Sequence, residues 1–196
     1  KGDPIRMIFQ PTPWRGLNVL LAAMQMVKNK NIKLDVYSST QVYGDAFKEA
    51  NDDKWVPLYK QASELPNVNY IGYRPNQFIL DNLQNYHIFA YPSIWEETSC
   101  ISAIECMSAG LYSIVTNYGA LYETCSEFPI YVQYLEDYKL LAKSFATAID
   151  IAADTLHLNV IQNNLDMQQE FYKRFYSWEK QADTWSNFLR GVTNVK

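Results

Sequence analysis

The sequence predicts an α/β fold: one parallel sheet of about six strands flanked by helices, followed by a helical C-terminal tail. Three observations lead to this prediction. Short β-rich apolar runs alternate with helical patterns through the first two thirds of the chain. These runs are apolar on both sides, as in a sheet whose two faces are both buried. After Asp137 only helical patterns follow.

Six runs are interpreted as strands, and turn-forming residues end several of them. The second run stops at a Ser-Ser-Thr sequence, the third is followed by Pro75, and the fourth by Pro92. The predicted strands are residues 6–10, 33–39, 68–73, 87–91, 112–116 and 129–135.

Helical periodicity fills the intervals between these runs. Residues 16–28 carry leucine, methionine and valine at helical spacing, and residues 77–84 supply a second short helix. Residues 45–63 are mostly helical with a break near Pro57. Residues 99–110 end at a glycine, which is typical just after a helix.

The chain is interpreted as one domain, residues 1–196, with a sheet region of about 1–136 and a helical tail of about 137–196. Three tail helices are expected, at 138–153, 159–176 and 178–189. We expect the tail to pack back on the sheet. Its aromatic side chains would then lie in the core: Phe171, Tyr172, Phe175, Tyr176, Trp178 and Trp185.

Composition excludes several classes of protein. With 48% hydrophobic and 19% charged residues, the 196-residue chain is neither disordered nor fibrous. A net charge of −4 provides no global positive field for nucleic acid, so no nucleic-acid partner is expected. No apolar run approaches the ~20 residues of a membrane span. Three cysteines without CxxC spacing favour a reducing compartment, and we expect a cytoplasmic protein without metal.

Parallel sheets bind ligands at the carboxyl ends of their strands. In this chain that edge must carry the loops that follow Gln10, Ser39, Tyr73, Ser93 and Asn117. The sequence therefore predicts a ligand site built from these loops.

The densest polar segment follows the fourth predicted strand. Glu97 and Glu105 are spaced Glu-x7-Glu there; in a continuous helix they would be ~12 Å apart along the axis. They suit two hydroxyl groups on different parts of an extended ligand, with anion-attracting N–H groups of the helix start between them. A structural alternative stays open: Ser102-x-x-Glu105 matches a capping box, and Glu97 would then be a solvated loop charge.

A second candidate cluster follows the first predicted strand. Arg15 precedes a predicted helix, where a lone cation is unfavourable unless an anion lies beside it. A guanidinium and helix-start amides both complement phosphate, and Gly16 would permit close approach of the backbone. The alternative is an exposed arginine after a proline-rich turn.

The two histidines and the common catalytic motifs give little indication of a further functional site. His87 and His157 have no cluster of ligating residues around them in the sequence and are interpreted as structural histidines. The motifs of dinucleotide dehydrogenases, P-loop enzymes, zinc proteases and serine hydrolases are absent from the sequence.

Several sequence segments, taken in order, resemble the C-terminal, donor-binding half of retaining GT-B glycosyltransferases of the family 4 type, the glycosyl transferases group 1. The match runs along nearly the whole chain. The segments are Arg15-Gly16-Leu17, residues 68–73, Tyr91-Pro92-Ser93, Glu97-x7-Glu105 with Gly110, residues 119–123 and residues 175–179.

This resemblance implies a Rossmann-like domain, one half of a GT-B fold, that binds a nucleotide-diphospho-sugar. By the resemblance, Glu97 contacts sugar hydroxyls and Arg15 binds the diphosphate; these are the expected catalytic residues. Glu105 would hold the ribose hydroxyls. The remaining expected donor-binding residues are Gly16, Gly72, Tyr73, Thr98, Ser99, Cys100 and Gly119.

The resemblance further implies a metal-independent hexosyltransferase without a cofactor, using a UDP-, GDP- or ADP-linked sugar. The acceptor, a glycan or a lipid, would bind through an N-terminal domain that this chain lacks. The isolated domain is therefore expected to be inactive. The full-length protein is expected in the cytoplasm, with peripheral attachment to a membrane as an alternative.

Two departures from the family pattern keep alternatives open. Gln10 stands where many members carry a second cation, and Thr98-Ser99-Cys100 replaces the usual glycine-rich stretch. The alternatives are a nucleotide-sugar epimerase or phosphorylase of the same fold, and a nucleotide-binding module without catalysis.

Overall fold

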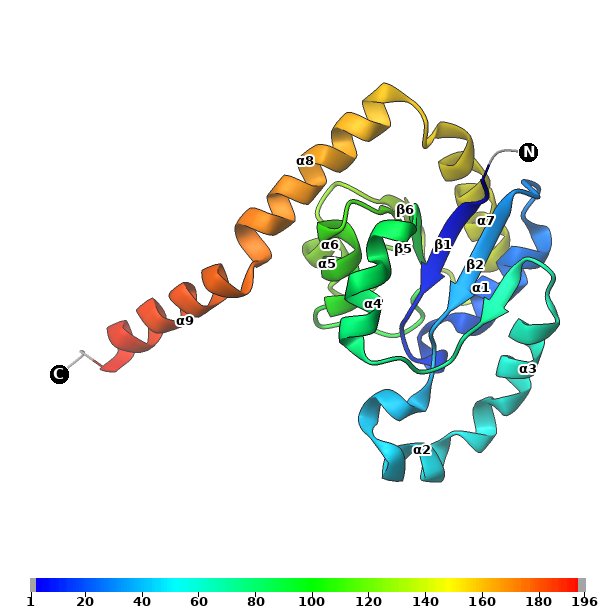
Figure 1. The fold of residues 1–196 in the computed structure, drawn as a ribbon, viewed down its shortest axis with the longest axis horizontal. Helices are drawn as coiled ribbons and strands as arrows, with labels where there is room; N and C mark the ends of the chain where they lie inside the picture. The colour runs from blue at the N-terminus through cyan, green and yellow to red at the C-terminus, as the bar shows by residue number, and fades with distance from the viewer. Residues whose placement is uncertain (1–2, 194–196) are drawn as a thin grey trace.

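The computed structural model describes residues 3–193 and contains the expected parallel α/β sheet. Its six strands run in the order β3-β2-β1-β4-β5-β6, and every pair is parallel (Figure 1). The strands are β1 Ile5–Phe9, β2 Ile32–Val36, β3 Val68–Tyr70, β4 Ile88–Tyr91, β5 Tyr112–Thr116 and β6 Ile130–Val132. This is the strand order of a Rossmann-like, doubly wound sheet, as predicted.

The helices alternate with the strands along the sheet and then continue alone to the C-terminus. They are α1 Leu17–Met26, α2 Asp45–Asn51, α3 Val56–Glu64, α4 Asn76–Asn82, α5 Ile101–Ser108, α6 Leu121–Cys125, α7 Tyr138–Thr155, α8 Asn159–Tyr176 and α9 Trp178–Thr193. Short 3-10 turns lie at Pro13–Arg15, Thr40–Tyr43, Asp53–Trp55 and Leu83–Asn85.

Burial explains why the central strands read as continuous apolar runs. All of β4 and β5 is buried, and so are the last three residues of β1. The edge strands β3 and β6 are only partly buried, and each has three residues. Helices therefore cover both faces of the sheet: α1 packs against α3 and α7, while α5 packs against α6 and α8.

Only part of the helical tail packs back on the sheet domain. Helices α7 and α8 do pack back on the domain, and Tyr172 of α8 is buried with its hydroxyl donating to the Thr124 carbonyl at 2.6 Å. Helix α9 instead projects away from the sheet (Figure 1), with Trp178 85% and Trp185 61% exposed. The prediction that these two tryptophans are core residues was wrong, because amphipathic spacing alone does not supply a surface to cover them. The same prediction was wrong for Phe175 of α8, which is 45% exposed.

The predicted break near Pro57 is confirmed. It separates α2 from α3, with the proline in the first turn of α3, where its missing N–H costs nothing. Other element boundaries differ from the prediction. Helix α5 begins at Ile101, so residues 92–100 form a loop longer than expected. Short helix α6 was not predicted. None of the helices in the described range is long and apolar enough to span a membrane.

A partly buried polar network ties β1, β2 and β3 to the turn before β4. Asp35 Oδ2 accepts from Arg6 Nη2 at 3.0 Å and from the Tyr86 hydroxyl at 2.6 Å. Asp35 Oδ1 accepts from Asn69 Nδ2 at 3.2 Å, and the Tyr37 and Tyr86 hydroxyls are 2.8 Å apart. Burial, followed by these hydrogen bonds and nearby charge, raises the pKa of Tyr86.

Replacing Asp35 should therefore weaken the fold. We expect Asp35→Asn to lower the free energy of unfolding by about 1–3 kcal/mol, because the Arg6 charge loses its partner inside a hydrogen-bonded network. Urea unfolding followed by circular dichroism measures this. Asp166→Asn, on the exposed face of α8, is the matched control and should change stability little. Equal effects of the two substitutions would contradict a stabilising role for the network.

Candidate functional site

The candidate site lies where β1 and β4 pair, at their carboxyl ends. Strands β2 and β3 extend the sheet on one side of this pair, and β5 and β6 extend it on the other. The loops after β1 and β4 touch: Gly16 has φ +102°, and a Cβ there would lie 2.0 Å from the Pro92 carbonyl oxygen. Only glycine fits this close backbone contact. Gly16 thus holds the two loops together; its predicted contact with a donor stays a prediction.

Arg15 and Glu97, predicted as separate ligand contacts, form an ion pair with each other. Arg15 Nη1 and the Tyr91 hydroxyl both donate to Glu97 Oε1. Glu97 is only 5% exposed, whereas the Arg15 side chain remains 22% exposed. The alternatives of a solvated Glu97 and a freely exposed Arg15 are therefore wrong.

Contact with Glu97 contributes to the raised pKa values of Arg15 and Tyr91. Burial lowers the pKa of Arg15, but the hydrogen bond and negative charge of Glu97 outweigh it, so the pKa lies above its ordinary value. Burial is also the main reason that the pKa of Tyr91 is raised, with further contributions from Cys100 and Glu97. Arg15 is thus a fixed cation and Tyr91 a fixed hydrogen-bond donor.

Backbone contacts fix the loop that carries Glu97. Ser93 Oγ donates to the Trp95 carbonyl at 2.9 Å, and Thr116 Oγ1 donates to the Ser93 carbonyl at 2.8 Å. The Ala120 N–H donates to the Glu97 carbonyl at 2.7 Å. A Cβ on Gly119 would lie 2.5 Å from the Glu97 nitrogen, so this glycine permits the close packing of the two loops. This packing does not test the predicted contact of Gly119 with a donor, which stays a prediction.

Glu105 lies in α5 and reaches toward the loops after β1 and β3. Its Oε1 accepts from Asn76 Nδ2 at 2.9 Å, and its Oε2 is 3.5 Å from Gln10 Nε2. The capping-box alternative is wrong, because Cys100 occupies the N-cap and Glu105 bonds to other elements. Burial raises the pKa of Glu105, while the hydrogen bonds from Asn76 and Gln10 oppose that shift.

A cavity of about 280 Å³ opens beside Gln10 at the carboxyl ends of β1, β2 and β3. Gln10 Oε1 is buried and has no hydrogen-bond partner among residues 3–193. Tyr73 is one of the predicted residues in the wall; Gly72, directly before it, has φ +71°. The lining residues are Gln10, Tyr37, Ser39, Val42, Tyr73, Arg74, Asn76, Ile79 and Ser102.

The remaining predicted residues lie between Glu97 and Glu105. Thr98 and Ser99 are exposed, and Cys100 is the buried N-cap of α5. Burial raises the pKa of Cys100 to about 12, so its thiol is not a reactive nucleophile. The first backbone N–H groups of α5 have no partners within the helix, as at every helix start.

No group of three or more His, Cys, Asp or Glu residues in the range 3–193 could hold a metal ion. His87 Nδ1 accepts a hydrogen bond from the Arg6 backbone N–H at 3.0 Å, a structural role of the kind predicted.

Three members of the site were not predicted from the sequence: Tyr91, Trp95 and Asn76. Tyr91 was noted only as part of the resemblance, although its position at the end of a buried strand would have placed it here. Trp95 lies with its ring 5.7 Å from the Arg15 guanidinium carbon. Nothing in the local sequence distinguishes Asn76, because its contact with Glu105 joins α4 to α5.

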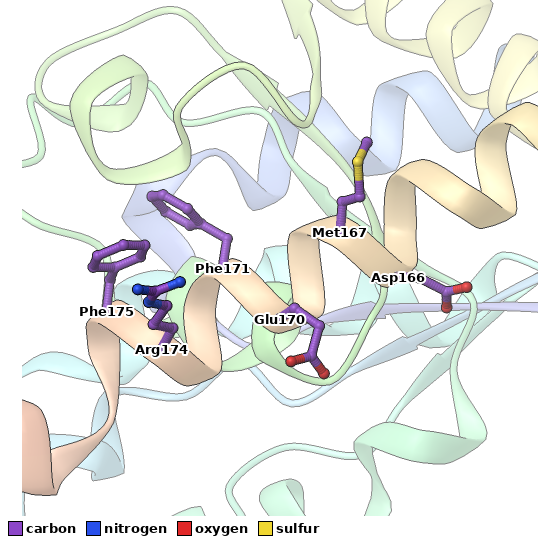
Figure 2. A pocket seen from close by; sticks show the side chains of 6 residues that line it. All are labelled: Asp166, Met167, Glu170, Phe171, Arg174 and Phe175. Atoms are coloured by element: carbon purple, nitrogen blue, oxygen red, sulfur yellow. The ribbon is translucent and has the colours of Figure 1, made fainter.

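A different hollow lies on the outer surface of α8. Figure 2 shows its lining side chains, all from this one helix: Asp166, Met167, Glu170, Phe171, Arg174 and Phe175. It contains none of the predicted site residues and is an open surface of one helix.

Comparison with known families identifies the chain. The model of the family "Glycosyl transferases group 1" matches residues 7–163, well over half of the sequence. The chain belongs to this family. A search of curated proteins gave no match.

Solved glycosyltransferases share the fold of this family member at low sequence identity. A glycosyltransferase from Rickettsia africae ESF-5 is 17% identical, with a TM-score of 0.75 over 100% of this chain and 49% of that one. HepE of Anabaena, solved with UDP, is 14% identical, with a TM-score of 0.71 over 94% of this chain and 49% of that one. The catalytic domain of a cholesterol-alpha-glucosyltransferase from Helicobacter pylori is 17% identical, with a TM-score of 0.64 over 88% and 99%. The chain thus spans about half the length of the first two.

The Arg15–Glu97 pair should contribute to stability in a way that a double-mutant cycle can isolate. We expect Arg15→Met, Glu97→Gln and the double variant to give a coupling free energy of about 1–3 kcal/mol in urea unfolding, because the carboxylate is buried.

The control pair is Lys60 and Glu64, 3.8 Å apart on the exposed surface of α3. Its cycle should give little coupling. A coupling at Arg15–Glu97 no larger than at this control pair would show that the buried contact has no energetic significance.

Proposed function

We propose that this chain is the donor-binding half of a retaining glycosyltransferase that transfers a hexose from a nucleotide-diphospho-sugar. The observation that carries the proposal is the placement of Glu97 and Glu105 on either side of the α5 start, each with a distinct environment. Glu97 contacts a cation, and Glu105 borders the Gln10 cavity through Gln10 and Asn76. One extended ligand can use both.

In this proposal the nucleoside occupies the cavity beside Gln10. Tyr73 supplies an aromatic ring to the base, and Glu105 accepts hydrogen bonds from the two ribose hydroxyls. The raised pKa of Glu105 reflects a carboxylate that burial disfavours and that two more hydrogen bonds would stabilise. That HepE was solved with UDP supports a nucleotide donor for this related fold.

The diphosphate would lie across the start of α5. Backbone N–H groups near Ser99 to Ser102 would donate to its oxygens, with the helix dipole favouring the negative charge. Arg15 engages Glu97 through Nη1, and its side chain remains 22% exposed. The guanidinium nitrogens that do not contact Glu97 would donate to phosphate oxygens.

Glu97 would orient the transferred sugar. Its Oε1 is held by Arg15 and Tyr91, whereas its Oε2 accepts no hydrogen bond from residues 3–193 and can receive a sugar hydroxyl. Because the Glu97 carboxylate is held in one place, an orienting role fits it better than a role as a nucleophile. As the bond to the diphosphate breaks, negative charge grows where Arg15 and the α5 amides are placed to stabilise it. No cofactor takes part in this scheme.

The acceptor, a glycan or a lipid, would enter from a second domain, since this chain spans about half the length of the similar structures from Rickettsia africae and Anabaena. The isolated chain should then bind donor without transferring the sugar. We place the whole protein in the cytoplasm or peripherally at a membrane surface.

A nucleotide-binding module without catalysis is the second candidate. The Arg15–Glu97 ion pair favours it, because a cation already neutralised by a carboxylate attracts a diphosphate less strongly. Release of nucleoside diphosphate from a nucleotide-sugar by the full gene product would decide for the enzyme. Tight donor binding with no release, in the presence of acceptor extracts, would decide for the module.

Nucleotide binding tests the proposed donor site directly. Titration calorimetry with UDP, GDP and ADP should show saturable binding of at least one nucleotide at roughly micromolar to millimolar dissociation constants. Absence of binding of all three at millimolar concentration would sink the donor-site proposal.

Glu105→Gln should weaken that binding about tenfold or more, because glutamine replaces a charged acceptor of the ribose hydroxyls. Folding raises the pKa of Glu105, so its ionised form costs stability above that pKa; the variant should keep or raise the melting temperature at neutral pH. Glu170→Gln, on the exposed side of α8, is the matched control and should leave affinity unchanged. An unchanged affinity in Glu105→Gln would return this residue to a structural role.

A further inference from the structure

We propose that the hollow between α1 and α3 is a carbohydrate-binding site for a pyranose ring, separate from the donor site. The hollow has a volume of about 380 Å³, within the roughly 300–1,000 Å³ of small-molecule sites. Its wall combines two indole rings with three polar side chains. The residues that carry the argument are Trp14, Asn18, Lys54, Trp55, Gln61 and Ile94.

The aromatic part of the wall is held in place by its neighbours. Trp14 lies with its ring centroid 5.9 Å from that of Trp55, at 41° between the planes. Trp14 is also stacked on Tyr43 at 6.0 Å and 16°, and Phe47 packs against both Trp14 and Tyr43. The rings are therefore preorganised and lose little conformational entropy when a ligand binds.

The polar part of the wall suits hydroxyl groups. Asn18 of α1 and Gln61 of α3 form no side-chain hydrogen bond with residues 3–193, and each amide can both donate and accept. Lys54 Nζ reaches only Asn51 Oδ1, at 3.5 Å, and lies 5.7 Å from the Trp55 ring centroid. Trp55 Nε1 is buried without a partner in the described part of the chain, although buried indole N–H groups usually have one.

This combination selects a sugar over other occupants. A pyranose ring presents C–H groups on its flat face, which the negatively polarised face of an indole attracts, and hydroxyls around its rim, which both donate and accept. A lipid chain would leave Asn18, Gln61 and Lys54 without partners, and that desolvation is unfavourable. The mixed wall therefore matches a carbohydrate best.

The hollow adjoins the candidate donor site without sharing its residues. Trp14 directly precedes Arg15, and Ile94 directly precedes Trp95, so the loops after β1 and β4 contribute to both. None of the residues proposed to bind the donor lines the hollow. Sugar binding here does not depend on nucleotide binding, and the failure of one proposal leaves the other standing.

Titration of the ¹⁵N-labelled chain with disaccharides tests the proposal through the indole N–H signals of its five tryptophans. The probes are maltose, cellobiose, lactose and N,N′-diacetylchitobiose. We expect at least one to shift the Trp14 and Trp55 signals saturably, at a roughly millimolar dissociation constant, while the Trp178 and Trp185 signals stay fixed.

Variants then locate the binding. Trp14→Ala should abolish the saturable shift at Trp55, and Asn18→Ala with Gln61→Ala should weaken binding about fivefold or more through lost hydrogen bonds. The latter two side chains lie on helix surfaces, so this variant keeps the test valid if Trp14→Ala fails to fold. Trp185→Ala on α9 is the aromatic control and should bind as the unmodified chain does.

The proposal would be overturned by any of these results: no saturable shift with any of the four disaccharides, equal weakening by Trp185→Ala, or shifts of Trp14 and Trp55 by dodecylphosphocholine and not by sugars. The third would identify the hollow as an apolar docking site. Shifts of the same two signals by UDP alone would assign it to the nucleotide and contradict a separate sugar site.

Discussion

The parallel pairing of β1 with β4, in which Met7 lies opposite Ile88 and Ile8 opposite Phe89, brings together loops that are far apart in sequence. Arg15 and Glu97 are separated by 82 residues and still share a hydrogen bond. Contact between the Gly16 and Pro92 backbones leaves no room for a side chain and fixes the loops against each other. Because β4 and the last three residues of β1 are buried, a shift of these loops would disturb the core.

Electrostatics at this junction follow from the same constraint. A carboxylate as buried as Glu97 requires compensation, which Arg15 and Tyr91 provide at one oxygen. The result is a charge pair whose cation is partly exposed and whose second carboxylate oxygen has no hydrogen-bond partner among the described residues. Such a pair is preorganised for a ligand that carries both negative charge and hydroxyl groups, which fits a sugar joined to a diphosphate.

Much of the fold was predictable because alternation of apolar runs and helical periodicity is a local signal. The sequence also predicted that Glu105 and Tyr73 lie at one edge of the sheet, because parallel strands place their carboxyl ends together. The Arg15–Glu97 pair was not predictable, since it depends on which strand lies beside β1. The contact of Asn76 with Glu105 was equally hidden, and the exposure of α9 could not be inferred from its amphipathic sequence, which gives a face and not a partner.

We have proposed that a nucleoside diphosphate lies across the start of α5, between Glu97 and Glu105. A crystal structure of the chain with the nucleotide that it binds most tightly tests this most directly. The account predicts diphosphate oxygens within hydrogen-bond distance of the Arg15 guanidinium and of backbone N–H groups at residues 99–102, with the ribose at Glu105. A nucleotide bound elsewhere, or one that contacts neither Arg15 nor Glu105, would contradict it.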